Sequence, residues 1–212
     1  MAALLSVSCA GRTSRLVLKP EELPGIPARP FIITDHKNIA AGEEMPPWII
    51  AMLDEGIAGI EARYEFRGRY VFISRNEGNN FSAMTRWMIN FSTELDFPRL
   101  AAARIEARFD AASPLPDQEF GAYYEALVCA ASDYPWKDAV RVDDFWIKKS
   151  YLPVEDEEEK ETWEFLILVT LEKERFATQL EEVFKNVKPN PQPAKDQINA
   201  ANRVKDRFFD GF

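Results

Sequence analysis

The amino-acid sequence predicts an α+β fold, with a four-stranded antiparallel sheet built from two hairpins and with helices packed on one face. Two observations lead to this class. Segments with the two-residue period of strands occur at 60–75 and 141–172, and segments with helical spacing lie between and after them. Each pair of strands needs only a short connection, so antiparallel pairing covered by helices satisfies this order.

The segment 163–172 predicts a central strand that is buried on both faces. Its alternate residues on one face are all apolar: Trp163, Phe165, Ile167, Val169 and Leu171. Leu166 and Leu168 keep the centre of the other face apolar, as in a strand with cover on both sides. Residues 141–151 alternate apolar and polar side chains, which predicts a half-buried strand that pairs with the first.

The segments 60–66 and 69–75 predict the other hairpin, with a tight turn at Gly68, which accepts a positive φ at little cost. Residues 47–56 predict a short helix that begins at a proline and ends at a glycine. Residues 31–34 predict a short strand able to dock on the sheet.

Helices are predicted between the hairpins and after them. Asn79 or Asn80 caps the first of these helices, whose apolar face follows helical spacing: Phe81, Met84, Met88, Phe91 and Leu95. A second helix begins near Asp96, with a single kinked helix as the alternative, and a third covers 120–131. The helix after the second hairpin carries another apolar stripe: Phe176, Leu180, Val183, Phe184 and Val187.

The net charge of -9 is concentrated in one predicted loop. Residues 153–162 hold six acids and one base, a net charge of -5, which leaves -4 for the other 202 residues. The chain has no concentrated basic patch, so nucleic-acid binding is not expected, because phosphate contacts need lysine and arginine on one surface. The acidic loop is interpreted as a solubilising loop.

The first residues predict attachment to a membrane. A run of apolar and small residues ends at Cys9, with Leu5 four residues before it and Ser8 directly before it, an order similar to that at a lipoprotein processing site. We therefore expect lipidation of Cys9, and an ordinary thiol in a frayed terminus is the alternative. No run of 18 apolar residues is present that would span a membrane as a helix.

These features give the predicted domain organisation. Residues 1–9 are the remnant of a lipoprotein signal, and residues 10–46, which contain five prolines, form a Pro-rich tether. Residues 47–190 form the α+β domain, and residues 191–212 form a linker and an amphipathic C-terminal helix. That helix either lies on a membrane or pairs with another copy.

The inventory of reactive groups favours a protein without catalytic activity. His36 is the single histidine, which excludes a Cys/His zinc cluster, and no phosphate-binding or nucleophile motif is present. Three pairs of acids are close enough in sequence to meet in a cleft: Asp143 with Asp144, Glu94 with Asp96, and Glu61 with Glu65. With 35 acids in the chain, such pairs arise by chance. No cofactor and no metal ion are expected.

The aromatic residues are expected to pack mostly in the core, and a cavity for a sugar or lipid is the alternative. Tyr134, Pro135 and Trp136 directly precede a predicted strand. We predict that these three residues form an exposed contact patch.

The order of features resembles a group of small bacterial envelope lipoproteins of spirochaete type, related to the twenty-kilodalton lipoprotein family. The resemblance covers residues 44–187 and rests on these segments: a cysteine after small residues, Pro47 and Trp48, RYVFISRNEG, FSTELDFPRLAAARIEAR, and DDFWIKKSY followed by WEFLILVTLEKERFATQL. It implies an α+β domain in the cell envelope, with no catalytic residues to transfer.

Taken together, the residues and the resemblance predict a non-catalytic, lipid-anchored protein of the bacterial cell envelope that faces the periplasm. We expect it to bind or scaffold a protein partner in the envelope. The alternative is a carrier of an apolar small molecule held between sheet and helices. The oligomeric state stays open.

Overall fold

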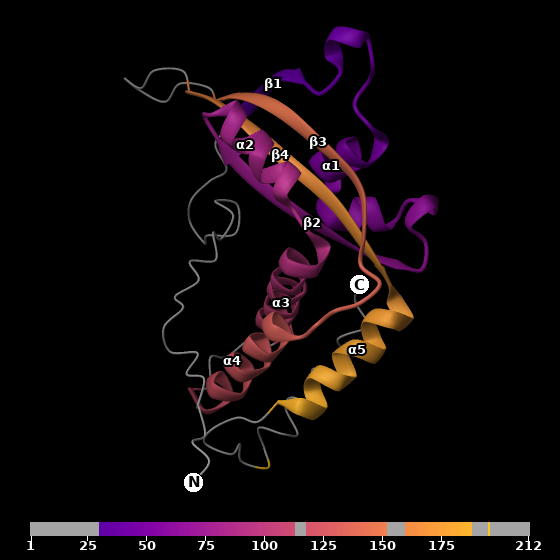
Figure 1. The fold of residues 1–212 in the computed structure, drawn as a ribbon, viewed down its shortest axis with the longest axis vertical. Coiled ribbons are helices and arrows are strands. Elements are labelled where there is room, and N and C mark those ends of the chain that lie inside the picture. Colours follow the sequence, from indigo (N-terminus) through magenta and orange to yellow (C-terminus); the bar gives the residue numbers. More distant parts are fainter. Residues whose placement is uncertain (1–29, 113–117, 152–159, 188–194, 196–212) are drawn as a thin grey trace.

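The computed structural model describes residues 30–112, 118–151, 160–187 and 195. In this part of the chain, four strands form one antiparallel sheet in the order β1-β3-β4-β2 (Figure 1). The strands are β1 (Phe31–His36), β2 (Arg69–Gly78), β3 (Val140–Tyr151) and β4 (Lys160–Glu172). The predicted α+β class and the four-stranded antiparallel sheet are confirmed.

Five α-helices accompany the sheet in the described residues: α1 (Pro47–Glu61), α2 (Phe81–Asn90), α3 (Thr93–Ala112), α4 (Gln118–Asp133) and α5 (Lys173–Asn186). Short 3₁₀ turns, η3 (Ile39–Ala41) and η4 (Tyr64–Phe66), connect β1 to α1 and α1 to β2. The predicted hairpin of β3 and β4 is present, and α5 buries the predicted residues Phe176, Leu180 and Val183.

The other predicted hairpin is wrong. Residues 60–66, expected to form a strand, form the end of α1 and the turn η4. Gly56 has a φ of 70° and a ψ of -151°, so the first half of α1 stops there as predicted, but a second helical half follows at once. In this conformation Ile60 and Phe66 are buried in the core cluster between α1 and the sheet. The fourth strand is β1 instead.

β1 also moves the start of the folded domain. Phe31 pairs with Tyr151 and His36 pairs with Ile147, with an irregularity in the register between Ile33 and Asp35. The predicted tether 10–46 therefore includes a strand of the sheet, and the predicted boundary at Pro47 lies too far along the chain. Cys9 and the predicted C-terminal helix lie outside the described residues.

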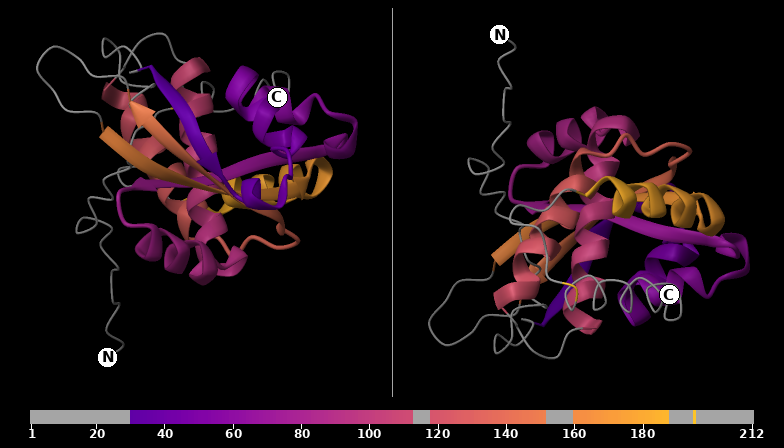
Figure 2. Two further views of the ribbon diagram at one scale, coloured as in Figure 1. Left: turned by 90° about the horizontal axis from the view of Figure 1, so that it is seen from above. Right: turned by 90° about the horizontal axis from the view of Figure 1, so that it is seen from below.

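Helices cover both faces of the sheet, which corrects the prediction of helices on one face only. Figure 2 shows α1 and α2 on opposite sides of the strands. On one face, Ile167, Val169 and Leu171 of β4 pack in a core cluster with α3, α4 and α5. On the other face, Leu166 and Leu168 pack with α1. Because β4 is apolar on both sides, each side needs a helix to exclude water.

The helices α2 and α3 are separate, and the break lies earlier than predicted. Asn80 caps α2 as predicted, since its side chain accepts a hydrogen bond from the Ala83 N–H at 3.0 Å. The Ser92 N–H donates to the Asp96 carboxylate at 2.8 Å where α3 begins. Leu95 therefore lies in the first turn of α3 and is 76% exposed, although it was expected on the buried face of the preceding helix.

Polar side chains block the outer edge of β2. The Val71 N–H donates to Glu61 of α1 at 2.7 Å, and the Val71 carbonyl accepts a hydrogen bond from Arg104 of α3. Glu61 and Arg104 are themselves paired at 2.9 Å, so one ion pair joins the helices on the two faces across this edge. Such a block prevents pairing with a foreign strand at Val71.

Candidate interaction surface

One of the three residues of the predicted contact patch, Trp136, lies in the core. The Trp136 ring is 7% exposed and stacks on Phe176 with ring centroids 5.0 Å apart, and its indole N–H donates to the Ala131 carbonyl at 2.9 Å. Tyr134 is half-buried, and its hydroxyl donates to Glu182. Pro135 is exposed. Trp136 is therefore not available to a partner, and the patch is reduced to Pro135 and part of Tyr134.

The predicted acid pair at the start of β3 is split between the two faces of the sheet. Asp143 lies opposite Leu168 and accepts a hydrogen bond from the Trp48 indole N–H at 2.8 Å. Asp144 lies opposite Ile167 and is held between Lys37 and Arg141, each at 2.8 Å. Both carboxylates thus tie elements together, and they do not converge on a common point.

Replacing Asp144 with asparagine is expected to make stability less dependent on pH in acid. Burial alone would raise the pKa of the Asp144 carboxyl, but the hydrogen bonds and charges of Lys37 and Arg141 outweigh it, so the folded-state pKa is lowered. The ionised form therefore stabilises the fold above the unfolded pKa of about 3.9, and this stabilisation is lost as the pH falls through the folded pKa.

Urea denaturation measures this effect. Near neutral pH the Asp144→Asn variant is expected to be less stable than the parent by about 1–2 kcal/mol, and the difference is expected to shrink near pH 3. A difference that stays the same at both pH values would contradict the pairing of Asp144 with the two bases.

The other two predicted acid pairs are also engaged separately. Glu61 caps the β2 edge and pairs with Arg104, whereas Glu65 is exposed and pairs with Arg63 at 2.6 Å. Asp96 accepts the hydrogen bond from Ser92 at the start of α3, and Glu94 is exposed. His36 stacks on Phe145 with ring centroids 5.8 Å apart. None of these side chains meets its predicted partner in a cleft.

A network of charged side chains on the α1 face of the sheet was not predicted. Lys149 and Glu164 are each 3% exposed and lie 2.5 Å apart. Arg75 contacts the same carboxylate at 2.8 Å, and Glu77 accepts hydrogen bonds from Tyr151 and Thr162 at 2.7 Å each. The described members of this network satisfy one another across β2, β4 and β3. We interpret it as a structural network that fixes the register of the strands.

An aromatic surface lies where α2 meets the opposite face of the sheet; it consists of Phe81, Trp146, Trp163 and Lys148. The Phe81 ring lies 5.3 Å from Trp146 and 5.9 Å from Trp163, centroid to centroid, and is 39% exposed. The Lys148 ammonium lies 5.3 Å from the Trp163 centroid. Trp146 and Trp163 are only half-buried. Ile32, 53% exposed, lies on the same face, opposite Ser150.

This combination has the composition of a protein-binding surface. Tryptophan and phenylalanine are enriched at protein interfaces, and tryptophan is enriched among the residues that contribute most of the binding energy. The sequence indicates that Trp146 and Trp163 share a face of the sheet, since both occupy alternating positions in predicted strands. Their exposure was not predictable, because it depends on how little of that face the short helix α2 covers.

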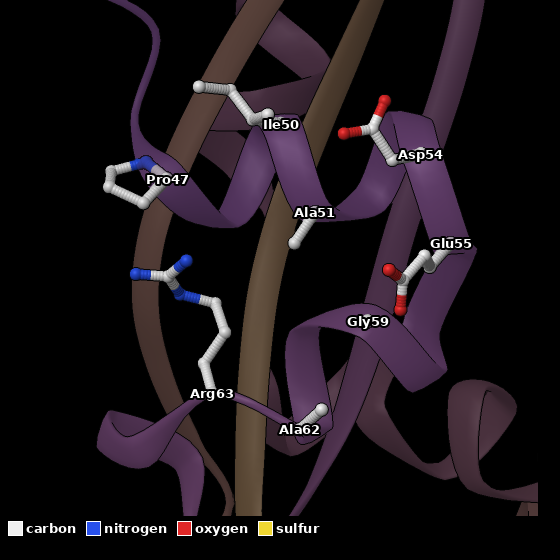
Figure 3. Close-up of a pocket in the computed structure, with 8 residues that line it drawn as sticks. All are labelled: Pro47, Ile50, Ala51, Asp54, Glu55, Gly59, Ala62 and Arg63. Carbon is white, nitrogen blue, oxygen red and sulfur yellow. The ribbon is translucent and has the colours of Figure 1, made fainter.

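A groove of about 380 Å³ lies on the outer side of α1. The two halves of α1 fold back on each other at Gly56, so that a Cβ atom on Gly59 would lie 2.8 Å from the Ala51 carbonyl oxygen. Figure 3 shows the acids Asp54 and Glu55 at one end of the groove and Arg63 at the other. Its lining is otherwise apolar or small: Pro47, Ile50, Ala51, Gly59 and Ala62.

Within the described residues, no group of three or more histidine, cysteine or acidic side chains is placed to hold a metal ion. The helices in that part of the chain include none that is long and apolar enough to cross a membrane.

Comparison with known proteins found no match: no protein-family model, no curated protein and no solved structure is significantly similar to this chain.

Proposed function

We propose that this protein is a non-catalytic, lipid-anchored protein of the bacterial cell envelope that binds another protein through the aromatic surface. The observation that supports this most is the exposure of Phe81 beside the half-buried Trp146 and Trp163. Burying such rings against a partner contributes roughly 1.5–3 kcal/mol for each large side chain. The envelope location and the anchor rest on the residues around Cys9 and on the resemblance.

The remaining side chains support a binding role over a catalytic one. Four of the six candidate acids are occupied by hydrogen bonds or ion pairs between elements of the fold: Asp143, Asp144, Glu61 and Asp96. General acid–base catalysis needs such a group within hydrogen-bond reach of a bound substrate. The groove on α1 is lined by Asp54, Glu55 and Arg63, of which Arg63 is already paired with Glu65.

No observation favours the alternative function, a carrier of an apolar small molecule, and it stays a prediction. Between the sheet and α3 to α5, aromatic rings contact one another closely: Phe72 lies 4.7 Å from Phe97 and 5.7 Å from Phe176, centroid to centroid. These side chains occupy the place where the ligand was expected.

Site-specific cross-linking in the native host tests the binding role. A photoreactive phenylalanine analogue is placed at Phe81 or, as the matched control, at Tyr64, an aromatic residue that is 85% exposed and lies in η4. We expect a discrete adduct with one protein at position 81 and none at position 64. The absence of an adduct at 81, or the same adducts at both positions, would overturn the proposal.

The anchor is tested separately by growing cells with a labelled fatty acid. The parent protein is expected to carry the label and to remain with the membrane fraction, and Cys9→Ala is expected to lose both properties. Cys129→Ala, a change at the other cysteine, is the control and is expected to keep the label. An unlabelled parent protein, or a labelled Cys9→Ala variant, would remove the anchor from the proposal without affecting the aromatic surface.

A further inference from the structure

The groove on α1 has the features of a site for one amphipathic helix. Its lining includes Ala51, Gly59 and Ala62, whose small size allows a close approach. Ile50 beside it is 46% exposed, which provides apolar area for a partner. Asp54 and Glu55 are exposed acids at one end (Figure 3). A helix with an apolar stripe bordered by basic residues matches this arrangement.

The chain itself contains such a segment. Residues 195–212 carry apolar residues at spacings of three and four: Ile198, Ala201, Val204 and Phe208. At about 100° per residue, Lys205 falls on the same side as this stripe. Its charge is opposite to those of Asp54 and Glu55.

We propose that residues 195–212 bind in the α1 groove, with Val204 and Phe208 against Ile50 and Ala51 and with Lys205, which lies on the side of the stripe, toward the two acids. This contact is independent of the aromatic surface, which lies on the other face of the sheet. It covers the exposed apolar residues of α1 with a part of the same chain.

The described elements place the segment within reach. The Lys173 N–H at the start of α5 donates to the Gly68 carbonyl at 3.0 Å, and Gly68 follows closely after Arg63 of the groove. The 14 residues of α5 extend about 21 Å away from that point. Residues 187–194 span up to about 26 Å when extended, which exceeds the length of α5 and is enough to return to the level of Gly68. A tethered segment of this kind has an effective concentration on the order of millimolar.

Disulfide trapping in the full chain tests the contact. In a background with Cys9→Ser and Cys129→Ser, Val204→Cys is combined with Ile50→Cys in the groove or with Ile89→Cys, a matched control that is 67% exposed on α2. We expect an intramolecular disulfide between positions 50 and 204 that forms at least about tenfold faster than that between 89 and 204, independent of protein concentration. Equal rates, or disulfides that form only between copies, would overturn the proposal.

Charge exchange provides a second measurement that does not depend on engineered cysteines. Asp54→Lys combined with Glu55→Lys is expected to increase amide hydrogen exchange in residues 198–208 by about tenfold, and adding Lys205→Glu is expected to reverse the increase. Amide exchange rates in residues 198–208 that are the same in the parent chain and in both variants would overturn the proposal. So would protection of residues 198–208 that occurs only when vesicles of anionic lipid are added, since the segment would then bind a membrane.

Discussion

Replacing Glu61 with alanine is expected to lower the free energy of unfolding by about 3–5 kcal/mol, because it leaves a buried guanidinium without its carboxylate. The side chains of Glu61 and Arg104 are only 9% and 13% exposed, and Glu61 also accepts the outward N–H of Val71. Burial lowers the pKa of the Arg104 guanidinium, and Glu61 opposes this shift. The loss therefore combines a buried guanidinium that no longer contacts the Glu61 carboxylate with a Val71 N–H that has lost its acceptor.

Urea denaturation of matched variants measures this loss. Glu65→Ala is the control, because Glu65 pairs with Arg63 at the surface, where an ion pair contributes about 0–1 kcal/mol. Glu61→Gln is expected to fall between the parent and Glu61→Ala, since the amide oxygen can still accept from Val71. If Glu61→Ala were no more destabilising than Glu65→Ala, the ion pair would not join α1 to α3 as described.

Replacing Trp136 with alanine is expected to destabilise the domain by about 3–5 kcal/mol, the cost of removing a large aromatic side chain from a core. Trp136 stacks on Phe176 and also contacts Phe97 at 6.1 Å between ring centroids. The measurement is thermal or urea unfolding, with Pro135→Ala as the neighbouring control. Because Pro135 is exposed, its replacement is expected to change stability by less than about 0.5 kcal/mol.

This variant also distinguishes the core role of Trp136 from the contact role predicted by the sequence. A stable Trp136→Ala variant that fails to bind a protein partner would support the predicted contact role of Trp136. A destabilised variant whose remaining folded fraction still binds would place the binding surface elsewhere, as the exposure of Phe81 indicates.

The elements that could be predicted are those whose pattern of apolar residues is compatible with only one type of secondary structure. β4 has too many consecutive apolar residues for a surface strand, and β3 alternates beside it. The helix α5 places its apolar residues at spacings of three and four, a pattern that no strand can bury on one face. These local patterns need no knowledge of the rest of the chain.

Residues 60–66 could not be assigned in this way because their pattern fits two structures. Ile60, Tyr64 and Phe66 alternate like a strand, but Ile57 and Ile60 also have the spacing of a helix. Tertiary contacts decide between these options: Ile60 and Phe66 bury against the sheet only if the chain turns at Gly56. Once these residues are helical, the sheet takes its fourth strand from β1.

The candidate surfaces were less predictable than the fold because they depend on register. Arg75 and Glu164 meet only because β2 and β4 pair with Arg75 opposite Leu166. Trp136 was expected to be exposed after Tyr134 and Pro135, but a hydrogen bond of 2.9 Å from the Trp136 N–H to the Tyr134 carbonyl makes a tight turn there. That turn directs the ring toward α5.

Native mass spectrometry of the protein purified from its native host tests the proposed binding role of the aromatic surface most directly. The parent chain and Tyr64→Asp are expected to appear as a complex with one protein partner, and Phe81→Asp is expected to appear as the bare folded chain. A bare parent chain, or a Phe81→Asp variant that keeps the same partner, would contradict the account.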